Sequence, residues 1–209
     1  MIRMRIFDMG ALHTNCYLVH NSKEAVVFDV PADPKPLLDF MAEEGLALTH
    51  IFNTHLHFDH VMGNAALSRA TGIPVFANKK DDYLTSPEMG GERFGLPPTP
   101  PFTYENLDAG EVPVLGATCK VLATPGHTPG SLSYYFEEPG WLFVGDVLFY
   151  RSMGRTDLPG GEAQTLFDSI RNVLFALPAE TEVHPGHGIP TTIGDEASNN
   201  PYVGKALKR

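Results

Sequence analysis

The chain has 209 residues, of which 43% are hydrophobic, and its formal net charge is −10. The length fits a single domain over residues 1–209 with a substantial core, because layered domains often reach this size without dividing. The acidic balance argues against a nucleic-acid partner, since such surfaces gather Lys and Arg to contact phosphates.

Short strand-like runs alternate with a few helical segments. We expect strands at 2–7, 16–20, 25–28, 50–53, 74–77, 112–115, 120–122, 132–136, 141–144 and 182–184, and helices at 34–44, 63–70, 80–84 and 162–177. The last helix places Leu166, Ile170 and Leu174 on one face, which suits packing on a sheet. Strand groups with helices that each need a sheet to cover predict an α/β fold in helix-sheet-sheet-helix layers.

The segment from His55 to His60 holds three histidines and an aspartate within six residues, as H-x-H-x-D-H. Imidazole and carboxylate are preferred ligands of zinc and similar ions. His55 and His57 can converge on one ion, and Asp59 and His60 can turn toward a second. The segment therefore predicts two metals side by side.

Further candidate ligands follow other strand-like runs. His127 lies in Pro125-Gly126-His127-Thr128-Pro129-Gly130, Asp146 ends Val144-Gly145-Asp146, and His187 lies in Pro185-Gly186-His187-Gly188. Strand ends and loops are where a rigid scaffold usually presents catalytic groups. Neighbouring glycines let the backbone approach an ion or substrate closely.

These residues and their order resemble the metallo-β-lactamase fold superfamily, and within it the glyoxalase II (hydroxyacylglutathione hydrolase) group. The resemblance also includes Asp29, which follows Val26-Val27-Phe28. It implies an αββα sandwich of two mixed sheets flanked by helices. It further implies one metal on His55, His57 and His127, a second on Asp59, His60 and His187, and Asp146 bridging the two.

Two adjacent metals can share a hydroxide and stabilise the groups that attack and leave. Asp59 is predicted to orient that hydroxide, which makes it a catalytic residue as well as a ligand. We expect zinc, although iron and manganese also suit this mixed nitrogen and oxygen ligand set. Asp29 is predicted to support the ligands by a hydrogen bond, as ligating histidines need a partner for their second nitrogen. The alternative is that Asp29 caps the following helix.

Two segments bear on the substrate. Residues 85–103 contain five prolines and three glycines and have no regular periodicity, so they form either a lid or a rigid surface loop, with Phe94 and Phe102 as apolar contacts. Arg151 and Arg155 follow Asp146 and could bind a substrate carboxylate. For Arg155 the alternative is a structural pair with Asp157.

The two cysteines, Cys16 and Cys119, form no C-x-x-C pair, which favours a reducing compartment over a disulfide framework. The N-terminal apolar stretch is too short for a signal peptide, and no run reaches the roughly 18 apolar residues of a membrane span. We therefore expect a cytoplasmic protein with no membrane partner. The sequence does not indicate its oligomeric state.

The chain differs from full-length glyoxalase II, whose C-terminal helical domain supplies basic residues that hold glutathione. Only 22 residues follow His187, ending in a short basic tail with Tyr202, Lys205, Lys208 and Arg209. The leading hypothesis is hydrolysis of a small-molecule thioester such as S-lactoylglutathione. The alternatives are a persulfide dioxygenase with a single iron and a lactonase that uses the same metals.

Overall fold

The computed structural model describes residues 1–204, so the basic residues of the tail, Lys205, Lys208 and Arg209, lie outside the described residues. The chain forms two compact units. The first comprises Met1–Leu107 with Pro113–Ala117, and the second comprises Asp108–Val112 and the chain from Thr118 onward. The prediction of a single domain is not tested by this division and stays a prediction.

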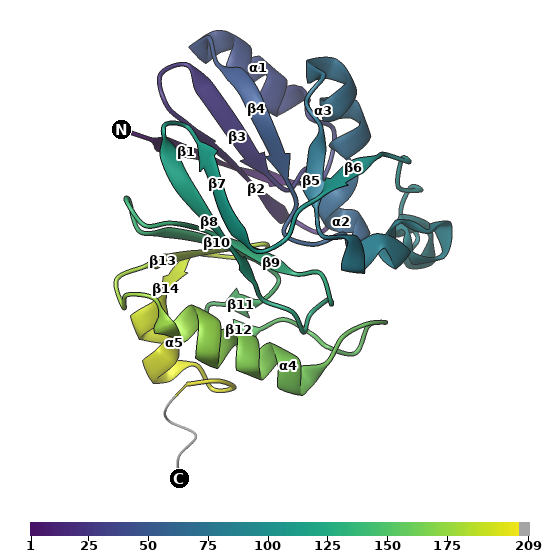
Figure 1. The fold of residues 1–209 in the computed structure, drawn as a ribbon. Helices are drawn as coiled ribbons and strands as arrows, with labels where there is room; N and C mark the ends of the chain where they lie inside the picture. The colour runs from purple at the N-terminus through teal and green to yellow at the C-terminus, as the bar shows by residue number, and fades with distance from the viewer. Residues whose placement is uncertain (205–209) are drawn as a thin grey trace. The chain divides into compact units, whose positions relative to one another are not determined.

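The first unit contains a six-stranded mixed sheet whose strands follow one another in chain order (Figure 1). Its strands are β1 (Arg3–Met9), β2 (Thr14–His20), β3 (Glu24–Phe28), β4 (Ala47–Phe52), β5 (Val75–Ala77) and β6 (Tyr104–Asn106). The first three strands pair antiparallel, whereas β3 to β6 pair in parallel. Every residue of β2 is buried, which is typical of a strand covered on both faces.

Helices α1 (Lys35–Glu44) and α3 (Asn64–Thr71) pack on this sheet. α1 buries Leu37 and Met41, which are one turn apart, and ends at Gly45, whose φ of 67° suits a left-handed helix C-terminus. These two side chains join Val27 and Ile51 of the sheet in one apolar core. The short helix α2 (Phe58–Val61) carries part of the histidine segment.

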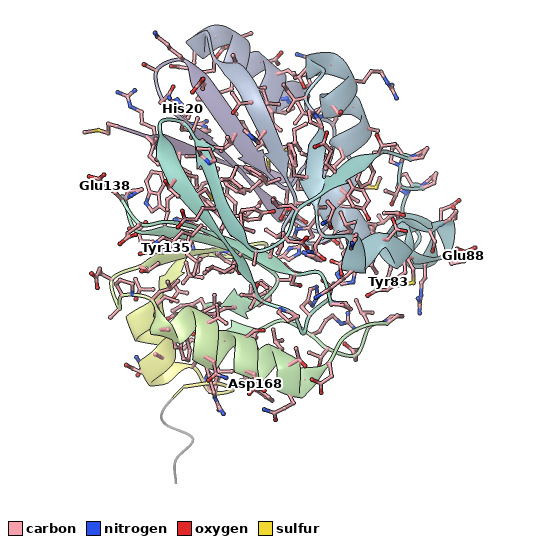
Figure 2. The ribbon with its side chains drawn as sticks, in the orientation of Figure 1. His20, Tyr83, Glu88, Tyr135, Glu138 and Asp168 are labelled. Carbon is pink, nitrogen blue, oxygen red and sulfur yellow. The ribbon has the colours of Figure 1, made fainter. Side chains whose placement is uncertain are left out.

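The proline-rich segment between β5 and β6 folds into short 3₁₀ helices, η1 (Lys79–Thr85), η2 (Pro87–Met89) and η3 (Gly91–Phe94). Figure 2 shows Glu88 at the outer end of this segment. Phe94 stacks on Phe58, with ring centroids 5.1 Å apart, and Phe102 lies 6.2 Å from Tyr104. The segment thus packs on the first unit through the two predicted aromatic contacts; that it acts as a lid stays a prediction.

The other six-stranded mixed sheet has the order β14-β13-β10-β9-β8-β7 and belongs to the second unit, except for the end of β7 and the first residue of β8. Its strands are β7 (Gly110–Val114), β8 (Ala117–Ala123), β9 (Leu132–Phe136), β10 (Trp141–Gly145), β13 (Glu182–Pro185) and β14 (Thr191–Thr192). The neighbouring strands β10 and β13 are parallel, and β9 pairs antiparallel with β10. A small hairpin of β11 (Leu148–Phe149) and β12 (Ser152–Met153) follows β10.

The predicted helix over 162–177 is present, although its hydrogen-bond pattern changes along its length. It runs as α4 (Ala163–Asp168), a π-helical turn η4 (Ser169–Val173) and a 3₁₀ turn η5 (Leu174–Ala176). Leu166, Ile170 and Leu174 are fully buried in the core of the second unit, as their spacing predicts. The helix α5 (Ile193–Asn199), which was not predicted from the sequence, buries Ile193 in the same core.

The predicted fold class of two mixed sheets flanked by helices is confirmed. All ten predicted strands exist, with bounds that differ by a few residues. The strands that were not predicted, β6, β11, β12 and β14, have only two or three residues each, too few to show an alternating pattern. Within residues 1–204, no helix is long and apolar enough to cross a membrane.

Candidate metal centre

The histidine segment begins where β4 ends and continues into α2. His55, His57 and His60 are buried, with exposed fractions of 2%, 7% and 0%. The ring of His55 lies 4.8 Å from that of His57 and 4.1 Å from that of His60, measured between centroids. Oδ2 of Asp59 lies 3.8 Å from Nε2 of His60. The first unit therefore gathers its four predicted ligands in one place.

Asp29 holds this segment by four hydrogen bonds. Its Oδ1 accepts from the backbone N–H of Thr54 at 2.8 Å and from Nδ2 of Asn53 at 3.2 Å. Its Oδ2 accepts from the Thr54 hydroxyl at 2.8 Å and from Nδ1 of His60 at 2.8 Å. The helix that follows has Pro34 at its N-cap and no side-chain cap, so the alternative that Asp29 caps α1 is wrong.

These contacts determine which nitrogen of His60 and His55 carries a hydrogen. A carboxylate only accepts hydrogen bonds, so Nδ1 of His60 carries the hydrogen, and in the neutral ring the lone pair is on Nε2. The Thr54 hydroxyl gives its hydrogen to Asp29, and so it accepts from Nδ1 of His55 at 3.0 Å. Nε2 of His55 then also has a lone pair. A lone pair on Nε2 is what a metal ligand requires.

Asp29 itself has an unusual backbone conformation, with a φ of 58°. A positive φ is uncommon outside glycine, and aspartate and asparagine tolerate it best. The backbone N–H of Asp29 donates to Phe52 O at 2.9 Å, and Val30 N donates to His60 O at 2.9 Å. The turn after β3 is thereby tied to both β4 and α2, which aims the carboxylate at the histidine segment.

The three predicted ligands of the second unit also lie together. Oδ2 of Asp146 lies 3.8 Å from Nε2 of His127 and 3.6 Å from Nε2 of His187. Asp146 follows β10 and His187 follows β13, its parallel neighbour, so the ends of the two strands present both side chains at one edge. Gly186 N donates to Gly145 O at 2.8 Å and fixes the two turns to each other.

His127 is oriented by a backbone carbonyl. Its Nδ1 donates to Arg155 O at 2.8 Å, which leaves the lone pair on Nε2, the atom nearer to Asp146. The turn before it is packed tightly, because a Cβ at Gly126 would lie 2.3 Å from the backbone nitrogen of Leu166. Only glycine fits this contact with α4.

Both predicted substrate-binding arginines bind carboxylates of the second unit. The guanidinium of Arg155 makes two hydrogen bonds of 2.7 Å to Asp157, and this pairing lowers the pKa of Asp157 to about 2. The guanidinium of Arg151 contacts Glu196 and Asp195, each at 3.0 Å. The structure thus contains the Arg155–Asp157 pair, and a substrate role for either arginine stays a prediction.

Several residues that position the ligands were not predicted from the sequence: Asn53, Thr54, Gly154 and the carbonyl of Arg155. A local pattern could have identified Thr54, since its hydroxyl directly precedes the histidine segment at the end of a strand. No local pattern identifies Gly154. A Cβ there would lie 1.9 Å from Asp146 O and 3.4 Å from the Cβ of His127. This contact depends on the β11–β12 hairpin returning to the strand end.

The cysteines take no part in this chemistry. Both are buried and free. Burial raises the pKa of the Cys16 thiol well above its ordinary value, with a further contribution from the charge of Asp29, and burial raises the pKa of Cys119 to about 12. Neither thiol is ionised at neutral pH, which excludes both as thiolate nucleophiles.

The fold agrees with that of known proteins. A family model described as the metallo-beta-lactamase superfamily matches residues 9–187, and the chain belongs to this superfamily. It is therefore a metal-dependent hydrolase of the metallo-beta-lactamase class.

Individual relatives align with nearly the whole chain. The hydroxyacylglutathione hydrolase GloC of Haemophilus influenzae is 35% identical over 97% of this chain and 98% of its own. The solved structure of the BLEG-1 B3 metallo-beta-lactamase is 38% identical, with a TM-score of 0.89 over 97% of this chain and 99% of that one. The structure of TTHA1623 in a di-iron-bound form is 39% identical, with a TM-score of 0.86 over 95% and 99%.

Proposed function

We propose that this protein hydrolyses a small-molecule thioester, of the type that S-lactoylglutathione represents, with two divalent metal ions. The observation that carries the proposal is the set of hydrogen bonds that leaves a lone pair on Nε2 of His55, His60 and His127. Membership of a metallohydrolase superfamily supports it, and so does the hydroxyacylglutathione hydrolase among the relatives.

The proposed ligands are the seven residues that the sequence predicts. The first ion would bind His55, His57 and His127, the second would bind Asp59, His60 and His187, and Asp146 would bind both. The donor set fits such ions, because buried imidazoles of fixed tautomer and carboxylates are common ligands of zinc, iron and manganese. Zinc is our first choice, and the relative solved with two irons keeps iron as a candidate.

Thioester hydrolysis adds one water across the carbon–sulfur bond. The water oxygen bonds to the carbonyl carbon, the carbon–sulfur bond breaks with its electron pair on sulfur, and the products are a carboxylate and a thiol. Bound divalent ions supply a water of lowered pKa and stabilise developing negative charge. A thiolate leaves readily, so the residues need not include a dedicated general acid.

Asp59 is the residue we assign to orienting the attacking water. Its side chain is 15% exposed, so it reaches solvent while the neighbouring His60 does not. The hydroxyl of Thr14 lies 3.4 Å from Oδ2 of Asp59 and donates to it, which limits the rotation of the carboxylate. A fixed acceptor beside the reacting water lowers the entropic cost of its attack.

The test compares three reactions of the purified protein: thiol release from S-lactoylglutathione, oxygen uptake with glutathione persulfide, and ring opening of a lactone. We expect thiol release without oxygen uptake, and about two metals per chain. Oxygen uptake with one iron per chain and no thiol release would establish the dioxygenase instead. Ring opening alone would establish the lactonase.

The matched variants are Asp146→Asn and Asp168→Asn. Asp168 lies on α4 as a surface control (Figure 2). We expect Asp146→Asn to lower the metal content and the rate of thiol release together, and Asp168→Asn to leave both unchanged. Two metals and full turnover in Asp146→Asn would exclude the bridging role.

A further inference from the structure

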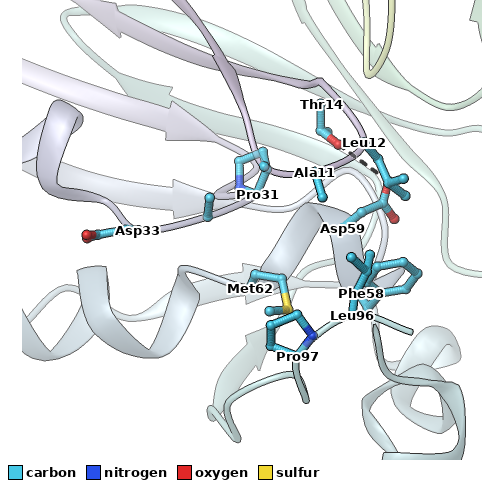
Figure 3. Close-up of a pocket in the computed structure, with 12 residues that line it drawn as sticks. Ala11, Leu12, Thr14, Pro31, Asp33, Phe58, Asp59, Met62, Leu96 and Pro97 are labelled. Atoms are coloured by element: carbon cyan, nitrogen blue, oxygen red, sulfur yellow. Dashed lines mark hydrogen bonds between the residues drawn. The ribbon is translucent and has the colours of Figure 1, made fainter. Parts of the chain in front are cut away.

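An apolar pocket of roughly 300 Å³ lies within the first unit, beside the carboxylate of Asp59 (Figure 3). The apolar side chains that line it include Leu12, Pro31, Phe58, Met62, Leu96 and Pro97. The volume is at the lower end of the range for small-molecule sites, which are typically apolar with a few polar groups. The pocket therefore adjoins a proposed catalytic residue and has the size for a short organic group.

Two walls of the pocket are fixed to the histidine segment. Gly63 N donates to Val30 O at 2.8 Å, and a Cβ at Gly63 would lie 2.0 Å from Ala32 O. The turn after β3 and the end of α2 are thus in direct backbone contact. This contact holds Pro31 and Met62 in place, so that the pocket exists before any ligand binds.

The third wall comes from the proline-rich segment. A Cβ at Gly91 would lie 2.5 Å from Pro97 O and 3.4 Å from the ring of Phe58, so this segment closes tightly on α2. Leu96 N donates to Gly91 O at 3.0 Å, which turns Leu96 and Pro97 toward Phe58. The proline-rich segment therefore supplies part of the pocket wall.

The lining favours a neutral hydrocarbon group. Among the described residues that line the pocket, none carries a positive charge, and the charged ones are the carboxylates of Asp33 and Asp59. Figure 3 shows Asp33 pointing away from the apolar side chains. Glutathione carries two carboxylates, which such a lining would repel. The acyl group of a thioester, in contrast, can be an uncharged chain.

We infer that this pocket binds the hydrocarbon chain of the acyl group, so that thioesters of short aliphatic acids are hydrolysed faster than the lactoyl thioester with which the proposed function is tested. The inference rests on the proposed function, because it places the carbonyl beside Asp59. Each buried methylene is worth about 0.8 kcal/mol, or close to fourfold in binding. Four added methylenes should then raise kcat/KM on the order of 10- to 100-fold, since part of the chain stays in contact with solvent.

The first experiment measures kcat/KM for acetyl, butyryl, hexanoyl and lactoyl thioesters of glutathione. We expect the value to rise from acetyl to hexanoyl in the native protein. Met62→Gln introduces a polar group of similar size into the pocket and should flatten this rise. Met4→Gln, on β1 and outside the pocket lining, should retain it. Equal values for acetyl and hexanoyl thioesters, or an unchanged rise in Met62→Gln, would overturn the inference.

The second experiment separates the pocket from the reaction. Isothermal titration of the metal-loaded protein with acetate and with hexanoate compares two ligands that share a carboxylate and differ only in chain length. We expect hexanoate to bind at least tenfold more tightly, and Met62→Gln to remove the difference. Equal affinities for acetate and hexanoate would contradict the inference that the pocket binds the acyl chain. If hexanoate binds more tightly but no thioester is hydrolysed, the proposed function fails while the pocket stands.

Discussion

Nδ1 of His60 donates a 2.8 Å hydrogen bond to Oδ2 of Asp29, although the two residues are 31 positions apart in the chain. The side chains are 0% and 3% exposed, so water does not compete for this bond. The same carboxylate holds Thr54, whose hydroxyl accepts from His55. One buried aspartate therefore sets the tautomer of two proposed metal ligands.

The first prediction concerns this carboxylate. Asp29→Asn replaces one acceptor oxygen by an amide that donates, so His60 and Thr54 lose their common acceptor. Changes at residues that hydrogen-bond metal ligands typically lower metal affinity by 10- to 100-fold. We expect a loss of this size, measured by competition with a chromophoric chelator.

Asp39→Asn is the matched control, because Asp39 is exposed on α1 and forms an ion pair with Lys35. It should bind metal like the native protein. Native affinity in Asp29→Asn, with the chain still folded, would show that the aspartate does not tune the ligands.

The second prediction concerns Gly154. In Gly154→Ala the new Cβ must displace the backbone carbonyl of Asp146, from which it would lie only 1.9 Å. Forcing an extra carbon into a packed site typically costs about 1–3 kcal/mol. We expect a loss of that size in urea unfolding, and a lower metal content because Asp146 moves. Gly110→Ala, where nothing lies within 4 Å of the new Cβ, should change neither; equal stability of the two variants would contradict the packing argument.

The third prediction concerns Glu196, a fully buried carboxylate on α5. It accepts from the backbone N–H of Arg151 at 3.0 Å, from Thr191 Oγ1 at 2.7 Å and from Asn200 Nδ2 at 2.7 Å. The segment it holds continues to Arg155, whose carbonyl orients His127. In Glu196→Gln an amide N–H₂ replaces one carboxylate oxygen and faces groups that donate hydrogen bonds. A buried polar group left without its acceptor costs about 1–3 kcal/mol of folding stability. We expect a lower thermal midpoint and weaker metal binding.

Asp195→Asn provides the comparison for Glu196→Gln. Asp195 also contacts the guanidinium of Arg151, but its side chain is 38% exposed. Exposed ion pairs contribute little to stability, so this variant should unfold and bind metal nearly as the native protein does. If the two substitutions have equal effects, burial is not what makes Glu196 important.

The fourth prediction concerns pH. His184 stacks on Phe143, with ring centroids 5.2 Å apart, and burial lowers its pKa from 6.5 to about 4. The carboxylate of Glu182 lies 3.6 Å away and acts in the opposite direction, but it is 56% exposed and is outweighed. Between pH 6.5 and 4 the unfolded chain binds a proton that the folded chain does not, so stability falls as the pH falls through this range.

His184→Phe removes this titration while keeping an aromatic ring on Phe143. The native protein should lose about 3 kcal/mol more than the variant between pH 7 and pH 4, measured by urea unfolding at each pH. Titration of the other histidines is common to both proteins and cancels. His13→Gln, at a side chain 80% exposed, should follow the native curve; parallel curves for native and His184→Phe would refute the prediction.

The sequence located strands and candidate ligands for a local reason. A buried strand such as β9 (Leu132–Phe136) is predicted from a short apolar run in the sequence, and its predicted bounds are those observed. The ligand candidates are histidines and aspartates beside glycine at the ends of such runs, a pattern contained within a few residues. Short elements such as β14 and the π-helical turn η4 depend on pairing or packing partners that no local pattern describes.

By itself, the sequence determined the fold class, the superfamily and the types of side chain available to bind metal, because each of these is written in residues close together in the chain. Only the tertiary structure decided that Asp29 binds His60 and Thr54 and does not cap α1. It also decided that the carbonyl of Arg155 accepts from His127 while the guanidinium binds Asp157. The apolar pocket beside Asp59 was likewise decided only there. The physical reason is that a hydrogen bond or a cavity wall requires atoms at defined distances, and chain folding brings those atoms together from residues tens of positions apart.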